Sequence, residues 1–235
     1  MQNKKAVLLF AIILSLYCPK ASAQSDSSII VQHLKTITKT EGYRNYKNIA
    51  LLNKTAEYIL SVFRQYADTA CYQPYRVNGT IYKNVVCRIG SNNNKPLVVV
   101  GAHYDVCGNQ EGADDKAKSQ SYPVKVMKVA YGTQGNFILL ARKTGAGEFV
   151  KKFTAGFKEV ATIETESLKA PAKIQGIDFS DHLNYWKFGY DALMITNTAF
   201  YRNRNYHHAS DKMETLDIPK MMKVIDTTFS TIINL

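Results

Sequence analysis

Apolar residues recur at helical spacing in five stretches of the chain. The clearest stretch is 46–66, where one face of the predicted helix is apolar and consists of Leu52, Ala56, Ile59, Leu60 and Phe63. Comparable spacing predicts further helices over residues 28–39, 147–157, 180–188 and 218–233. In the last of these, the side chains expected on the buried face are Met221, Val224, Ile225 and Phe229.

Strand patterns lie between these helices. Apolar and polar residues alternate from Cys71 to Gly90 around Asn78-Gly79, which predicts a β-hairpin. The continuous apolar run from Leu97 to Ala102 predicts a strand that is covered on both faces and is central in its sheet. Shorter strands are predicted over 137–141 and 192–196. Because strands and helices alternate, we expect an α/β fold with helices on both faces of a mixed sheet.

The first residues follow a different pattern. Lys4 and Lys5 precede an apolar run from Ala6 to Leu16, and Ala21-Ser22-Ala23 offers a small-residue cleavage site. This order predicts a secretory signal peptide over residues 1–23, which leaves one domain over 24–235 and implies a periplasmic or secreted protein. A short membrane anchor or a buried helix is the alternative, but the run is short for a membrane span.

The charge of the chain does not point to a nucleic-acid partner. Removal of Lys4, Lys5 and Lys20 with the leader lowers the formal net charge from +11 to +8. The remaining lysines and arginines are scattered singly, without a basic helix or zinc-finger spacing. We therefore expect no nucleic-acid ligand, and no membrane contact after cleavage.

Three cysteines remain after residue 23, namely Cys71, Cys87 and Cys107. An odd number in an oxidising compartment leaves at least one thiol without an intramolecular disulfide. Cys71 and Cys87 flank the predicted turn almost symmetrically, so a disulfide between them stays open as a possibility.

Histidine and aspartate residues cluster at three places. His103 and Asp105 follow the predicted central strand, where ligands collect in layered α/β sheets. Imidazole nitrogens and carboxylate oxygens together suit zinc, and a carboxylate two residues from a ligand histidine can fix its tautomer. Taken singly, each is more often a surface residue, a satisfied core residue or part of a turn. The other members of these clusters are Asp114, Asp115, Asp181, His182, His207, His208 and Asp211.

The chain resembles the zinc aminopeptidases of peptidase family M28, which share their fold with glutaminyl cyclases. The resemblance rests on VVVGAHYDVCGNQEGADD, then GIDFSDHLNYWKFGYDALMITNTAFYRN, then NYHHASDKMETLD before the final helix. It implies a three-layer α/β/α sandwich with a mixed central sheet. It also implies zinc-dependent removal of amino-terminal residues from peptides or proteins by a metal-activated water.

The resemblance also implies roles for individual residues. His103 and His207 match histidine ligands of zinc, and Asp114 matches the aspartate that bridges two zinc ions. Asp105 matches the carboxylate that supports the first histidine, and Asp115 follows the bridging position. The substrate pocket would be formed by Asp181, His182, Trp186 and Tyr201.

The sequence departs from the family directly after Asp115. In the family a helix follows, then a strand that ends in the catalytic Glu-Glu pair, then a strand with a further acidic ligand. Here Lys116 leads straight to Pro123, so about two βαβ units, on the order of sixty residues, are missing. The general base, which contributes about 10²–10⁴-fold, is absent with them.

Without these elements we expect at most one of the family's one or two zinc ions. Glu111, Glu164 and Glu166 are not favoured as replacements. A sheet that has lost interior strands should expose apolar edges, be less stable and tend to associate. Three hypotheses follow: an exported aminopeptidase, a non-catalytic relative that binds metal or a peptide terminus, and the product of an internally deleted gene. A glutaminyl cyclase is a further alternative.

Overall fold

A computed structural model describes residues 24–90, 96–112, 119–171, 174 and 176–235. The predicted signal peptide over 1–23 lies outside the described residues. Asp114 and Asp115 also lie outside them. None of the helices in these ranges is long and apolar enough to cross a membrane.

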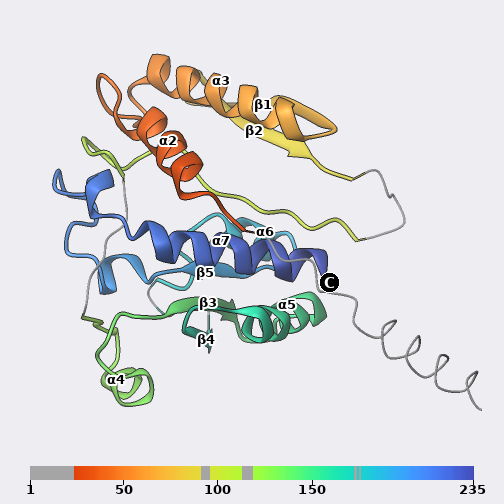
Figure 1. Cartoon of the computed structure of the whole chain (residues 1–235), viewed down its shortest axis with the longest axis vertical. Helices are drawn as coiled ribbons and strands as arrows, with labels where there is room; N and C mark the ends of the chain where they lie inside the picture. Colours follow the sequence, from red (N-terminus) through yellow and green to blue (C-terminus); the bar gives the residue numbers. More distant parts are fainter. Residues whose placement is uncertain (1–23, 91–95, 113–118, 172–173, 175) are drawn as a thin grey trace, which may run out of the picture.

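The first half of the chain forms two helices and a hairpin, as the sequence predicts. Their bounds are α2 Ser27–Thr38, α3 Ile49–Tyr66, β1 Thr69–Val77 and β2 Thr80–Arg88. Asn78 and Gly79 both have positive φ, 47° and 81°, which is the geometry of a tight hairpin turn. Helix α3 lies along the hairpin (Figure 1), with Leu52, Ala56 and Leu60 buried.

The second half is built around a three-stranded mixed sheet in the order β4-β3-β5. Strand β3 pairs in parallel with β4 and antiparallel with β5. One face of β3, with Ile138 and Leu140, packs on helices α5 and α7. The other face, with Leu139, packs around Trp186. The bounds here are β3 Ile138–Lys143, α5 Glu148–Val160, β4 Thr165–Ala170, α6 His182–Lys187, β5 Met194–Thr196 and α7 Ile218–Ile233. Shorter helices are α4 Lys125–Tyr131, η1 Ala199–Tyr201 and η2 Met213–Thr215.

The α/β class is therefore confirmed, but the strands do not form one central sheet. In the described ranges the hairpin and the β4-β3-β5 sheet are separate. The single sheet of a three-layer sandwich is thus not established.

The predicted central strand from Leu97 to Ala102 is wrong. This segment is not a strand, and Leu97, Val99 and Val100 are 78%, 58% and 69% exposed. A strand requires neighbouring strands, and an apolar run cannot reveal whether they exist. The exposure agrees with the expectation that the shortened chain leaves apolar edges uncovered.

The buried face predicted for α7 is only half right. Met221 and Val224 pack into apolar clusters, whereas Ile225 and Phe229 are 43% and 50% exposed. The helix buries Thr227, Ser230 and Thr231 instead, and Thr231 lies beside Gly156 of α5, against which α7 packs. The hydroxyl of Thr231 is satisfied by donating to the Thr227 carbonyl at 2.7 Å.

No disulfide joins the hairpin strands. Cys71 pairs with Val86 and Cys87 pairs with Ala70, so the two cysteines occupy adjacent pair positions. Adjacent positions point to opposite faces of a strand pair. All three cysteines are therefore free thiols in the structure.

Candidate functional site

His103 and Asp105 contact each other as their spacing suggests. Nδ1 of His103 donates to the backbone oxygen of Asp105 at 3.0 Å and lies 3.3 Å from its carboxylate. The hydrogen bond from the His103 ring to the Asp105 carboxylate raises the pKa of His103 to about 8, against the opposing effect of burial. Because Nδ1 is engaged, Nε2 is the ring nitrogen left for another ligand.

Two residues that the sequence did not single out hold this loop in place. Arg44 is buried and donates from Nε to the Tyr104 carbonyl and from Nη2 to the Glu111 carbonyl, both at 2.9 Å. Asn45 donates from Nδ2 to the Gly108 carbonyl at 2.9 Å. Both lie in a polar turn between α2 and α3, a context in which arginine and asparagine carry no distinctive pattern.

The carboxylate of Glu111 has a structural role. It accepts hydrogen bonds from Nζ of Lys39 at 2.9 and 2.8 Å and from the backbone nitrogen of Met213 at 3.0 Å. Lys39 also binds Glu214, and its pKa is raised first by Glu111. Glu111 thus joins α2, the loop and η2, rather than being available as a general base.

His207 belongs to the same electrostatic neighbourhood as His103. It is exposed, has a φ of 64° and stacks on Tyr206 with ring centroids 3.9 Å apart. Its pKa is lowered by burial first, and then by repulsion from His103 and His208. The Asp181 carboxylate in turn helps to raise the pKa of His103. Residues from three distant segments therefore act on one another electrostatically.

The residues predicted to form the substrate pocket divide into two groups. Asp181, His182 and Tyr201 line a cavity of about 1000 Å³. Trp186 does not line it: its indole is buried in the core beside β3 and donates from Nε1 to the Ala192 carbonyl at 2.9 Å. The structure thus places Trp186 in the core, and its predicted role in a substrate pocket stays a prediction.

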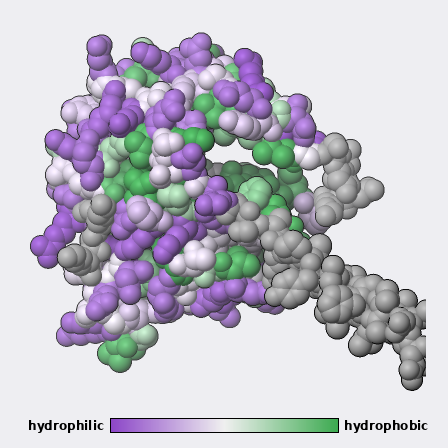
Figure 2. All heavy atoms as spheres, viewed as in Figure 1, coloured by the Kyte–Doolittle hydropathy of each residue, from purple (hydrophilic) through white to green (hydrophobic). Residues whose placement is uncertain are grey.

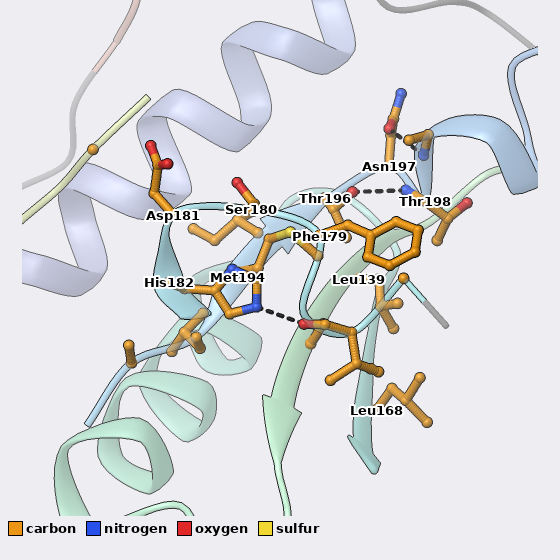
Figure 3. Close-up of a pocket in the computed structure, with 18 of the residues that line it drawn as sticks. Leu139, Leu168, Phe179, Ser180, Asp181, His182, Met194, Thr196, Asn197 and Thr198 are labelled. Atoms are coloured by element: carbon orange, nitrogen blue, oxygen red, sulfur yellow. Dashed lines mark hydrogen bonds between the residues drawn. The ribbon is translucent and has the colours of Figure 1, made fainter. Parts of the chain in front are cut away.

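His182 is buried and its position is fixed. Nε2 donates to the Ile177 carbonyl at 2.5 Å (Figure 3), and the ring meets Trp186 edge-on with centroids 4.5 Å apart. Burial lowers the pKa of His182. His182 thus shapes the wall of the cavity as a neutral imidazole.

The cavity is lined by the exposed segment from Leu97 to Ala102 and by residues of all three strands of the β4-β3-β5 sheet, and its walls are mainly apolar. Figure 2 shows a hollow on this side of the molecule with hydrophobic residues inside it. His103 and Asp181 are polar groups on its wall. The mainly apolar cavity therefore borders residues whose charges act on one another.

The described residues do not by themselves complete a metal site. No group of three histidine, cysteine, aspartate or glutamate side chains in the described part of the chain is placed to hold a metal ion. Of the three predicted ligands, His103 and His207 lie within the described residues and Asp114 lies outside them.

Comparison with known proteins supports the resemblance. The model of peptidase family M28 matches residues 84–136, which include His103, Asp105, Asp114 and Asp115. This match confirms the recognition of the family over that part of the chain. No solved structure matches the chain.

One relative matches over almost its whole length. The uncharacterized protein YfbL of Escherichia coli (strain K12) is 27% identical over 293 aligned positions, which cover 92% of this chain and 90% of YfbL. Since 92% of 235 residues is about 216, about 77 of the 293 positions have no counterpart in this chain. The chain is thus shorter than its relative by an amount comparable to the missing βαβ units.

Proposed function

Taking the match to peptidase family M28 as the premise, we propose that this protein is an exported metallopeptidase-like protein that binds one zinc ion and the amino terminus of a peptide, without efficient hydrolysis. The observation that carries the proposal is the engagement of Glu111. It is the glutamate nearest in sequence to His103 and Asp105, and its carboxylate is held by Lys39 and the Met213 backbone.

The remaining candidate glutamates support the same conclusion. Glu164 precedes β4 and Glu166 lies on it, and β4 is separated from β5 by β3. Leu168 of β4 lines the cavity beside His103, but neither Glu164 nor Glu166 does. Neither carboxylate therefore stands on the cavity wall, where a replacement base would be needed.

His103, Asp114 and His207 would hold the metal. A zinc ion bound there supplies a Lewis acid for a peptide carbonyl. Asp105 orients the His103 ring through Nδ1. The exposed Asp181 carboxylate would attract the positively charged amino terminus, and Tyr201 would contribute to the wall beside the bound peptide.

A working aminopeptidase is the second candidate, and the His103–Asp105 pair favours it. This pair retains the arrangement in which a carboxylate orients a ligand histidine. A gene product shortened by deletion is compatible with either reading, and the unmatched positions in the YfbL alignment support such a shortening.

Zinc stoichiometry and turnover measured on one preparation test the proposal. We expect about one zinc per chain and no turnover of aminoacyl-p-nitroanilides above the zinc blank. His207→Ala should lose the zinc, whereas the matched variant His208→Ala should retain it. Turnover that disappears in His103→Ala would establish the aminopeptidase instead, and absence of zinc from the wild-type protein would contradict both.

A further inference from the structure

We propose that the segment from Leu97 to Ala102 closes onto the free edge of β5 and pairs with it as an added strand. The closure requires neither metal nor peptidase activity, so it goes beyond the proposed function.

The first observation is the state of the segment itself. Its sequence, LVVVGA, is rich in the β-branched residues that favour strands. Leu97, Val99 and Val100 are nevertheless largely exposed, and none of the backbone hydrogen bonds found among the described residues involves residues 97–102. Apolar side chains and backbone groups are therefore both without the partners that a strand provides.

The second observation is the edge of β5. The order β4-β3-β5 leaves one side of β5 without a neighbouring strand in the described sheet. Met194 and Ile195 point to opposite faces of the sheet, yet both line the cavity. The cavity therefore reaches both faces of β5, and residues 96–103 line the same cavity. Among the described residues, a segment without a strand partner and a strand with one unpartnered edge thus border one apolar space.

The third observation is the way in which the segment is attached. Arg44 ties the loop that follows it to the turn before α3. Helix α2 is joined to α3 by a hydrogen bond of 2.6 Å between His33 and Tyr58. The segment, α2, α3 and the hairpin can therefore move together as one lobe, which we call the hairpin lobe.

The hairpin lobe meets the rest of the molecule at α2 (Figure 1). Ser25 binds Asp226 of α7 through its backbone nitrogen and its hydroxyl, at 2.9 and 2.5 Å. Val31 and Leu34 pack against a small apolar cluster around Met213 and Leu216. The hairpin lobe thus contacts the rest of the molecule through α2 and borders the apolar cavity through residues 97–102. This arrangement suits a hinge at α2. Closure would carry His103 with the segment toward β5.

Hydrogen exchange on the unmodified protein tests the closure. We expect the amides of residues 97–102 to exchange about 100-fold or more slowly than in an unstructured peptide of the same sequence, because strand pairing protects them. The measurement is made with EDTA present, so its outcome does not depend on zinc. Exchange at the unprotected rate would overturn the proposal, and so would protection that appears only at high protein concentration, since that indicates pairing between two copies.

Cysteine cross-linking provides the second test. In a background with Cys71→Ser, Cys87→Ser and Cys107→Ser, Val99→Cys is combined in turn with Met194→Cys, Ile195→Cys and Thr196→Cys. At least one pair should form an intramolecular disulfide, because paired strands bring Cα atoms within about 4.4–6.8 Å. The control pair, Val126→Cys with Ile195→Cys, should not. Only intermolecular disulfides, or the same yield for the control, would contradict the closure.

Discussion

Arg44 holds the backbone of Tyr104 by a hydrogen bond of 2.9 Å from Nε to the carbonyl oxygen. The same guanidinium also binds the carbonyls of Ile37 and Glu111, so one side chain joins the end of α2 to both ends of the loop that carries His103 and Asp105. The local geometry of the candidate site thus depends on a residue that would not itself touch metal or peptide.

Replacement of Arg44 by alanine should destabilise the protein. Three carbonyls would lose a charged donor, and each buried unsatisfied group costs roughly 1–3 kcal/mol. We expect the free energy of unfolding in urea to fall by about 2 kcal/mol or more. Arg204→Ala, at an exposed arginine, is the control and should change it by less than about 0.5 kcal/mol. Equal effects of the two substitutions would argue against the role of Arg44.

Gly112 should tolerate no side chain. Its φ is +69°, and a Cβ would lie only 2.2 Å from Cγ1 of Val106. Gly112→Ala should therefore cost about 2 kcal/mol or more, because overlap adds to the left-handed backbone. Gly108→Ala, with a φ of +71° and open space around it, isolates the backbone effect and should cost about 1–2 kcal/mol. In urea unfolding, the loss of unfolding free energy caused by Gly112→Ala should be smaller in a Val106→Ala background than in the wild type. The loss caused by Gly108→Ala should be the same in both backgrounds.

Glu111→Gln should separate a structural role from a catalytic one. Glutamine can still accept from the Met213 backbone, so only the ion pair with Lys39 is weakened, at a cost of about 1 kcal/mol or less. If the protein has any peptidase activity, its kcat should be unchanged within about twofold, since loss of a general base costs about 10²-fold or more. A decrease of that size at unchanged stability would identify Glu111 as the base.

Acidification should destabilise the fold through His182. Burial lowers the pKa of this histidine in the folded protein below its ordinary value of 6.5. As the pH falls below 6.5, the unfolded chain takes up a proton first, so the free energy of unfolding decreases until the folded pKa is passed. The difference between urea midpoints at pH 7.5 and pH 5 should be smaller in His182→Gln than in the wild type. An identical difference would show that His182 titrates normally. His103 acts in the opposite sense, since its raised pKa of about 8 favours the folded state at low pH.

The leader should be removed on export. Expression of the full chain in a bacterium with an intact secretion pathway should give a mature protein that begins at Gln24, which intact-mass measurement would detect. Ala23→Arg should block the cleavage and leave the leader attached. A cytoplasmic product that still begins at Met1 in the wild type would refute the signal peptide.

The sequence predicts the helices and the hairpin well because their signals are local. The apolar spacing in α3 and the Asn78-Gly79 turn each act within a few residues of one another. The segment from Leu97 to Ala102 could not be predicted in this way, because its apolar run is equally consistent with a covered strand and with one whose neighbours are missing. In α7, Thr227 and Thr231 are buried and Phe229 is exposed, an outcome of packing against distant elements that a periodicity argument cannot foresee.

The candidate site is predictable where its members are close in sequence. The contact between His103 and Asp105 could be expected from their separation of two residues. The role of Arg44 depends on a contact across sixty residues, and nothing near it in the sequence marks it. The sequence could not place Trp186 in the core rather than on the cavity wall, because an amphipathic aromatic side chain suits both equally well.

The contact between Ser25 and Asp226 spans 201 residues. The helix α3 and the hairpin, in contrast, find their partners among immediate neighbours along the chain. This part of the protein can fold early, but helix α2 acquires its docking surface only when the last helix has been made. Contacts of such long range form slowly, because the entropy of closing a long loop is lost before the contact contributes any stabilising energy. We therefore expect the junction between the two halves to form last, so that this is the part of the chain that stays open longest during folding.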